Sequence, residues 1–267
     1  MLNEIRLDDT FGVSESIAAG LTLFLIVFVG VTGNILILFV VVQIMKERQN
    51  TPNYLIFIQA VADLTNLVLP TIQPLMTYVT GVYIGGSVAC NIHGTVLHFT
   101  NSFCVLTLVA TVTDRVFAIS LPYLYAECNV PSRFRIAVFV STVLTCSTVF
   151  AILPAAGFGR NVPHYPNTYC LFALDDVTSK DKAVVLVNIG LLTTILTVIV
   201  GGNCVCCYSV YRMINYRHSV HESESSVISD SRERRQEIVF LQLSLFTLTL
   251  FVVCWMPFYV SMGDQEP

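Results

Sequence analysis

Six long apolar runs constrain what this chain can fold into more than any other feature of its sequence. A helix that crosses the hydrocarbon core of a bilayer needs about 20 mostly apolar residues. Each run exceeds that length, and the predicted helices cover about residues 17–45, 53–79, 89–119, 134–157, 183–213 and 236–262. Charged residues make up 12% of the chain, about half the share of a soluble domain. The sequence therefore predicts an all-α membrane protein embedded in the lipid bilayer, and its net charge of -4 argues against a nucleic-acid partner.

The segments between the runs predict how the chain is oriented. Ten of the fourteen Lys and Arg residues fall in or beside the segments after the first, third and fifth runs, which places those segments in the cytoplasm. The N-terminus, residues 1–16, is then extracellular, residues 214–235 form the third cytoplasmic loop, and residues 263–267 return to the outside. The acidic N-terminus lacks the basic region of a signal peptide, so we expect the first helix to direct insertion.

Nine cysteines divide between the two sides of the membrane. Seven lie within helices or on the cytoplasmic side, where thiols stay reduced. Cys90 and Cys170 fall outside, so we predict that they form a disulfide that ties the second outer loop to the third helix. Cys204, Cys206 and Cys207 lie in a helix that offers no second ligand pair, so packing or lipidation is favoured there over a metal site.

Polar residues within the apolar runs are candidate functional positions. Asn34 and Asp63 lie at membrane depth in the first and second helices, where a charge costs several kcal/mol unless it faces a cavity or a partner. The alternative for both is a polar contact that only holds helices together. Asp114 lies 24 residues after Cys90, about 36 Å of helix, so Asp114 and Arg115 are predicted at the cytoplasmic end of the third helix.

The sixth predicted helix contains a candidate activation switch. Pro257 has no N–H to donate and is expected to kink the helix, and Trp255 beside it offers a pivot. An ordinary proline kink is the simpler alternative. Glu237 precedes Trp255 by five helical turns at the cytoplasmic end, where it is predicted to pair with Arg115 and form a two-state lock.

Together these residues resemble the rhodopsin-like (class A) G-protein-coupled receptors. The matching positions are Gly33-Asn34, Ala62-Asp63-Leu64, Cys90 with Cys170, Asp114-Arg115-Val116 with Pro122, and Cys254-Trp255-Met256-Pro257-Phe258. The resemblance implies a seven-helix bundle, of which six helices are present here, with an agonist pocket on its outer side. It implies an activation switch at Trp255 and a sodium ion near Asp63. It also implies that Arg115 is released from Glu237 to engage a heterotrimeric G protein, with Tyr123 packing into that protein from the second inner loop.

A narrower resemblance is to the prostanoid receptors, and among them to the prostaglandin E type. It rests on residues 157–170 in the second outer loop, residues 77–90 at the first outer loop, and residues 118–125 in the second inner loop. It implies a prostaglandin-like lipid ligand at the plasma membrane and a rise in cyclic AMP. The family's two carboxylate-binding positions outside its seventh helix correspond to Thr168 and Tyr78.

The chain departs from the prostanoid pattern in three ways. Tyr169 stands where that family has a loop tryptophan, and Trp255 stands in a helix that usually lacks one in that family. The family's main carboxylate partner is an arginine on the seventh helix, and this sequence does not include that helix. We therefore expect a truncated receptor fragment or a six-helix variant that signals poorly on its own.

Other functions match fewer residues. An amine receptor usually carries an acidic residue seven positions after Cys90, where this chain has Leu97. A peptide or orphan receptor remains open, with His93 and His98 as pocket donors or as packed helical side chains. A six-helix transporter or channel is expected to show inverted repeats or broken helix pairs, and the sequence shows neither. No nucleophile–base pair or metal set has catalytic spacing, so neither an enzyme nor a metal site is expected.

Overall fold

The computed structural model describes residues 5–8, 11–47, 50–127, 132–173 and 179–220. The predicted sixth helix lies outside these residues, and with it Trp255, Pro257 and Glu237. The described chain falls into two compact units, and each is considered by itself. The first unit comprises residues up to Thr111 together with Val130–Thr193, and the second comprises Val112–Asn129 and the chain from Thr194.

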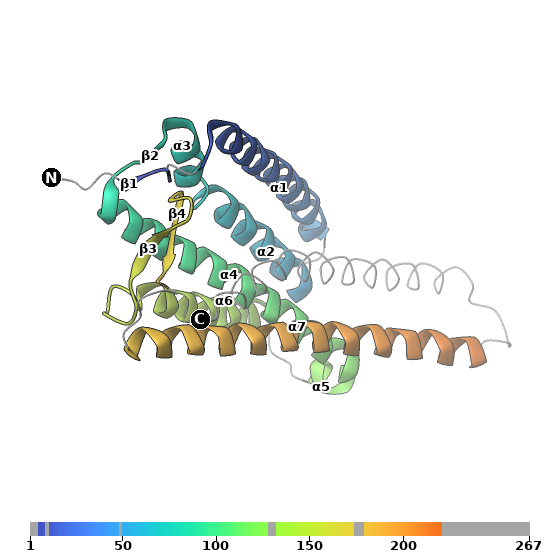
Figure 1. Cartoon of the computed structure of the whole chain (residues 1–267). Coiled ribbons are helices and arrows are strands. Elements are labelled where there is room, and N and C mark those ends of the chain that lie inside the picture. The colour runs from blue at the N-terminus through green and yellow to red at the C-terminus, as the bar shows by residue number, and fades with distance from the viewer. Residues whose placement is uncertain (1–4, 9–10, 48–49, 128–131, 174–178, 221–267) are drawn as a thin grey trace. The chain divides into compact units, whose positions relative to one another are not determined.

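Long helices dominate the first unit (Figure 1). They are α1 (Val13–Glu47), α2 (Thr51–Val68), α3 (Ile72–Thr80), most of α4 (Gly86–Ser120) and α6 (Ser132–Ile152). Helix α1 packs along α2 and α3, and α2 also contacts α6. Asn50 caps α2 by accepting a hydrogen bond from the Asn53 amide, as expected for asparagine at an N-cap. The predicted helix at residues 134–157 is shorter at its C-terminal end, because α6 gives way to turns around Pro154.

The second apolar run forms two helices instead of the single predicted one. Residues 69–71 separate α2 from α3, and together the two helices still span enough apolar length to cross a membrane. Pro70 and Pro74 explain the break. In a continuous helix the residue-74 amide would donate to the Pro70 carbonyl, and proline has no N–H to do so. The Pro70 carbonyl therefore needs a partner from outside the helix.

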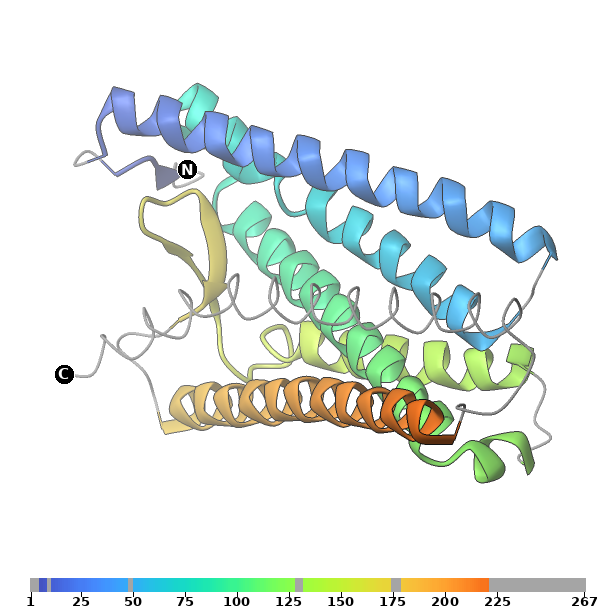
Figure 2. The ribbon, with the colours of Figure 1, turned by 90° about the vertical axis from the view of Figure 1, so that its right-hand side faces the viewer.

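Two short antiparallel sheets lie at one end of this unit (Figure 1). β1 (Ile5–Arg6) pairs with β2 (Val82–Tyr83), and β3 (Asn161–His164) pairs with β4 (Tyr169–Phe172). The β3–β4 hairpin lies beside the first turns of α4, to which the Cys90–Cys170 disulfide ties it (Figure 2). This confirms the predicted disulfide. Residues 1–16, which were predicted to be a short extracellular N-terminus, contain β1 and the first turn of α1.

The second unit, as far as it is described, contains the last turns of α4, the short helix α5 (Pro122–Glu127) and most of α7 (Ser179–Val220). Helix α7 continues through residues 214–220, which were predicted to begin the third cytoplasmic loop. The remainder of that loop and residues 263–267 lie outside the described residues. Gly202 allows α7 to approach α4 closely, since a Cβ there would lie 2.4 Å from a methyl group of Val112.

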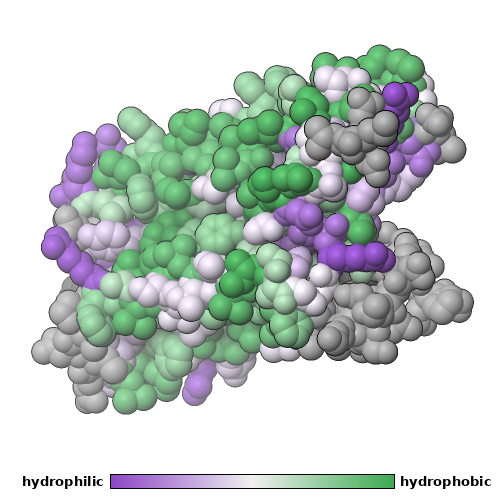
Figure 3. Space-filling view, turned by 90° about the vertical axis from the view of Figure 1, so that its left-hand side faces the viewer, coloured by the Kyte–Doolittle hydropathy of each residue, from purple (hydrophilic) through white to green (hydrophobic). Residues whose placement is uncertain are grey.

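The outward surfaces of these helices are hydrophobic. Five spans within the described residues are long and apolar enough to cross a membrane. On α1, large side chains such as Phe28 and Phe39 are more than half exposed. Figure 3 shows hydrophobic side chains over most of the coloured surface, with hydrophilic ones gathered mainly toward its edges. Because a water-facing surface of this composition would be unfavourable, the surface is suited to lipid.

Candidate functional site

The N-terminal segment joins the hairpin to the end of α3. The Leu7 amide donates to the Gly81 carbonyl at 3.0 Å, next to the β1–β2 pairing. The Asp8 amide donates to the Pro166 carbonyl at 3.2 Å, and the Asn167 side chain donates to the Arg6 carbonyl at 3.0 Å. Asn167 has a positive φ of 70°, a left-handed backbone conformation that asparagine tolerates better than most residues. These bonds build the outer end of the first unit from three separate stretches of sequence.

Two tyrosines lie within electrostatic range of each other at this outer end. Tyr78 lies on α3, and its electrostatic influence reaches Tyr169 at the start of β4. Burial, and to a smaller extent the neighbouring Tyr78 phenol, raises the pKa of Tyr169. Thr168, the residue before Tyr169, is 1% exposed. The two predicted carboxylate-binding residues, Tyr78 and Thr168, are therefore on elements that come together, and the raised pKa of Tyr169 keeps its O–H available as a donor.

A mainly apolar cavity of about 660 Å³ opens next to Tyr78. Its walls come from the outer turns of α1 and the end of α3, with Leu7 and Phe11 from the N-terminal segment. Phe11 lies between two aromatic rings, with centroids 6.1 Å from Tyr78 and 6.1 Å from Tyr165. Thr168 is not among the lining residues, so Tyr78 is the predicted ligand residue that borders this cavity.

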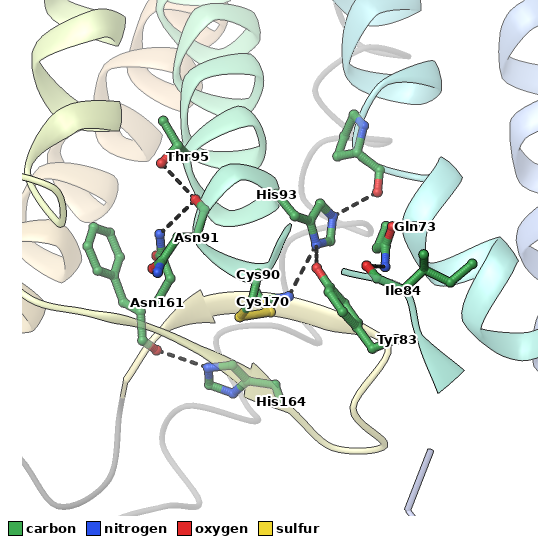
Figure 4. Close-up of a disulfide and its surroundings, with 12 residues drawn as sticks. Gln73, Tyr83, Ile84, Cys90, Asn91, His93, Thr95, Asn161, His164 and Cys170 are labelled. Atoms are coloured by element: carbon green, nitrogen blue, oxygen red, sulfur yellow. Dashed lines mark hydrogen bonds between the residues drawn. A yellow bond between two sulfur atoms is a disulfide. The ribbon is translucent and has the colours of Figure 1, made fainter. Parts of the chain in front are cut away.

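His93 was a candidate pocket donor, but both of its ring nitrogens form hydrogen bonds with other groups of the protein (Figure 4). Nε2 lies 2.8 Å from the Pro70 carbonyl oxygen, and Nδ1 lies 2.9 Å from the Tyr83 hydroxyl and 3.4 Å from the Cys170 amide nitrogen. His93 and Tyr83 are both buried, and burial raises the pKa of the Tyr83 phenol. His93 thus supplies the partner that the broken α2–α3 helix requires.

His98 and Leu97 lie one turn further along α4. The His98 ring lies against Phe172 of β4, with ring centroids 3.9 Å apart. Asn161 of β3 fits against α4 at Gly94, where an added Cβ would lie 2.5 Å from the asparagine side chain. Leu97 is half-buried, and its carbonyl accepts a hydrogen bond from Thr100 at 3.3 Å. The hairpin therefore covers this face of α4 closely.

Polar side chains of α2 and α4 face each other in the membrane interior. The Asp63 carboxylate accepts a hydrogen bond from Gln59 Nε2 at 2.9 Å and lies near the Cys104 thiol of α4. One turn away, the Thr100 hydroxyl donates to Asn66 Oδ1 at 2.7 Å. Asn34 donates to the Gly30 carbonyl of its own helix at 2.9 Å. Asp63 therefore lies in an interhelical network to which the sequence interpretation had not assigned Asn66, Thr100 or Cys104.

The second unit contains the predicted G-protein end. Asp114 is 3% exposed and accepts a hydrogen bond from the Tyr125 hydroxyl at 3.1 Å. Arg115 is half-buried and lies within electrostatic reach of Asp114, Tyr125 and Cys206 of α7. Tyr123, predicted to contact the G protein, is 84% exposed on α5, which begins at Pro122. The predicted partner of Arg115, Glu237, lies outside the described residues, as do Trp255 and Pro257.

Besides Asn66, Thr100 and Cys104, two tyrosines were missed as site residues from the sequence. Tyr125 belongs to the inner-loop stretch that resembles the prostanoid receptors, and Tyr169 was noted only as a departure from their pattern. Both signals were in the sequence, but the partners Asp114 and Tyr78 are on other elements. Their roles became visible once the fold placed those elements together.

Comparison with known proteins agrees with this arrangement. The sequence pattern described as "7 transmembrane receptor (rhodopsin family)" matches residues 33–263. The chain is 25% identical over 185 residues to the prostacyclin receptor of Mus musculus, covering 69% of this chain and 43% of that receptor. It is 26% identical over 205 residues to the prostaglandin E2 receptor EP4 subtype of Rattus norvegicus, covering 75% and 41%. The chain thus spans less than half the length of these relatives.

The fold is similar to that of squid rhodopsin. The TM-score with its crystal structure is 0.80 at 18% sequence identity, over 93% of this chain and 68% of that one. Since the identity is low, this likeness concerns the helical architecture.

Proposed function

The chain belongs to the rhodopsin family of seven-transmembrane receptors, and on this basis we propose that it is a plasma-membrane receptor for a prostaglandin-like lipid, coupled to a heterotrimeric G protein. Its family contains receptors and not enzymes, in agreement with the sequence interpretation. The proposed ligand class is supported by the prostanoid receptors among its relatives. The observation that carries it is that Tyr78 lies within electrostatic range of Tyr169, the residue that follows Thr168, at the outer end of the first unit.

The proposed ligand is an acidic lipid, and these residues suit its carboxylate. Hydrogen bonds to an ionised acceptor are about twice as strong as neutral ones. The raised pKa of Tyr169 keeps its phenol protonated at physiological pH, so it donates without placing a second negative charge beside the ligand. The apolar cavity beside Tyr78 offers a surface for a hydrocarbon chain. The N-terminus is extracellular in this proposal, which puts the site on the side from which the ligand arrives.

We extend the proposal to a sodium ion at Asp63. Sodium prefers oxygen ligands, so the Cys104 sulfur is a poor ligand for it. The Gln59 Oε1 atom is buried and has no hydrogen-bond partner among the residues that the structure describes, although the same amide donates to Asp63. A carboxylate and an unsatisfied amide oxygen are therefore available together, and they would supply charge and oxygen coordination to the ion. The bound ion would neutralise Asp63 at membrane depth.

The inner end supplies the proposed coupling surface. Asp114, held by Tyr125, lies next to Arg115, and this fixes the charged end of α4. The exposed Tyr123 on α5 is proposed to pack into the G protein. The sequence-predicted release of Arg115 from Glu237 and the pivot at Trp255 beside Pro257 remain part of the proposal. A rise in cyclic AMP is the proposed output.

Saturation binding of tritiated prostaglandin E2 to membranes from cells that express the chain tests this function. We expect saturable binding, weakened by about tenfold in Tyr78→Phe, Tyr169→Phe and Thr168→Ala, since each loses one hydrogen bond to an ionised group worth about 1.5–3 kcal/mol. Tyr123→Phe, at the inner end, serves as a matched control and is expected to bind like the parent. The absence of saturable binding by a correctly inserted parent chain would overturn the proposed ligand. Cyclic AMP measured in the same cells tests the output separately.

A further inference from the structure

One imidazole connects three separate elements at the outer end of the first unit. His93 lies on α4 one turn after Cys90 and contacts the α2–α3 junction through Pro70, β2 through Tyr83 and β4 through Cys170 (Figure 4). Tyr78 lies eight residues after Pro70, on α3, and Thr168 lies two residues before Cys170. The ring therefore lies between the supports of the two proposed carboxylate-binding residues.

The partners of His93 determine where its proton must be. The Pro70 carbonyl can only accept, so Nε2 at 2.8 Å must carry the proton and donate it. The Cys170 amide can only donate, so Nδ1 must be unprotonated, and its one lone pair is shared between the Tyr83 hydroxyl at 2.9 Å and the Cys170 amide at 3.4 Å. A single protonation state satisfies all three bonds, and it is the neutral ring with its proton on Nε2.

A second proton on His93 disrupts this arrangement. Nδ1–H would then point at the Cys170 N–H, and two donors cannot share a hydrogen bond. The Tyr83 hydroxyl can turn to accept, but the backbone amide of Cys170 cannot. The charged ring would also be buried, with a carbonyl, a phenol and an amide as its contacts. Of these three contacts Tyr83 is the titratable one, and its raised pKa keeps it neutral throughout the range in which histidine titrates.

We propose that His93 is a positioning residue of the outer site: in its neutral form it holds α3 and the β3–β4 hairpin in the arrangement that binds ligand, and its protonation in acid loosens the hairpin about its disulfide anchor and lowers ligand affinity. The site it positions is the one proposed above, so the ligand-affinity part of this inference rests on the proposed function. The positional part does not depend on any ligand. Histidine is thereby a sensor of extracellular pH and not a ligand contact.

The positional part is tested first, without ligand. Two nitroxide labels are introduced as noncanonical amino acids at exposed positions, Val79 on α3 and Arg160 at the base of the hairpin. Pulsed electron–electron double resonance then reports the distance between these two elements. We expect one narrow distance distribution at pH 7.5 and a broad one at pH 5.5. In His93→Gln, whose amide can donate and accept but does not titrate, the distribution should be equal at the two pH values. His164→Gln, on β3, is the matched control and should keep the parent's response.

Binding of tritiated prostaglandin E2 at the same two pH values tests the affinity part. We expect the affinity of the parent to fall about tenfold at pH 5.5, as loss of a bond of about 1.4 kcal/mol would cause. In His93→Gln the affinity should fall only as far as acid alters the ligand itself. The contribution of His93 is the difference between the fall in the His164→Gln control and the fall in His93→Gln. A His93→Phe chain, which fills the space without hydrogen bonds, should show the low affinity at both pH values.

The possible outcomes separate the two proposals. A distance distribution in the parent that does not change with pH overturns the role of His93, and so does a change that persists in His93→Gln. If His93→Gln does not fold, His93→Phe takes its place in the distance measurement, because it cannot titrate either and should show the broad distribution at both pH values. A parent that shows the pH-dependent distances but no prostaglandin binding overturns the proposed ligand and leaves the role of His93 standing.

Discussion

The hydroxyl of Tyr125 donates a hydrogen bond to Asp114 Oδ1 across 3.1 Å and so joins α5 to the end of α4. The two residues are eleven positions apart, on either side of the bend before Pro122. Asp114 is 3% exposed, and its neighbour Arg115 is part of the same electrostatic cluster. A neutral phenol therefore helps to satisfy a buried carboxylate at the proposed coupling end of the receptor.

Replacing Tyr125 by phenylalanine should destabilise this end of the protein. The change removes a donor from a buried carboxylate, which costs about 1–3 kcal/mol. We expect a lower unfolding temperature of the purified chain in lipid nanodiscs and slower nucleotide exchange on an added G protein. Tyr123→Phe, altered at an 84% exposed side chain, is the control for stability and should unfold like the parent. Equal unfolding temperatures for all three chains would show that the bond contributes nothing.

Adjacent glycines on α7 should respond oppositely to alanine. At Gly202 the new Cβ would lie 2.4 Å from a methyl group of Val112, so either side chain or backbone must shift, at about 1–3 kcal/mol. At Gly201 the new Cβ would meet no atom of the described residues within 4 Å beyond its own helical turn, and alanine favours a helix by up to about 1 kcal/mol. We expect Gly202→Ala to lower the unfolding temperature and Gly201→Ala to keep or raise it. The reverse order would contradict the close contact of α7 with α4.

The bridge between Asn66 and Thr100 should contribute a measurable coupling energy. The hydroxyl–amide bond of 2.7 Å joins α2 to α4, and interhelical hydrogen bonds in membranes contribute about 0.6–2 kcal/mol. A double-mutant cycle of Asn66→Leu and Thr100→Val, followed by unfolding in mixed micelles, measures the pair directly. Thr22→Val is the control, because the Thr22 hydroxyl donates within its own helix to the Ala18 carbonyl. A coupling energy of zero would mean that the two side chains stabilise the helices independently.

Alkaline pH should destabilise the outer end through Tyr83. Its pKa is raised by burial, so the folded protein holds the phenolic proton more tightly than the unfolded chain, in which tyrosine has a pKa of about 10. The sign follows from linkage: this stability is fully present below about pH 10 and is lost as the pH rises above it. We expect the unfolding temperature to fall less steeply between pH 9.5 and 11 in Tyr83→Phe than in the parent. Identical slopes would indicate that Tyr83 ionises equally easily in both states.

Much of the architecture follows from the sequence alone. Apolar length and charge spacing are local properties, and they predicted the spans that correspond to α1, α4 and α7. The Cys90–Cys170 disulfide could be predicted because the other cysteines fall in helices or on the reducing side. The break at Pro70 and Pro74 could also have been predicted, since a proline four residues after a helical carbonyl removes the donor to that carbonyl. It was missed because the apolar run continues through both prolines.

What the sequence by itself determined is therefore a set of membrane helices, one disulfide and a receptor-family resemblance, because each depends on the composition or spacing of nearby residues. The tertiary structure alone decided which polar side chains meet. It brought Tyr78 near Tyr169, it joined Asp114 to Tyr125 and Asn66 to Thr100 by hydrogen bonds, and it gave His93 the carbonyl that a proline had left without a donor. The physical reason is that a hydrogen bond requires approach within about 3 Å, and residues far apart in the chain reach that distance only when the packing of whole helices brings them there.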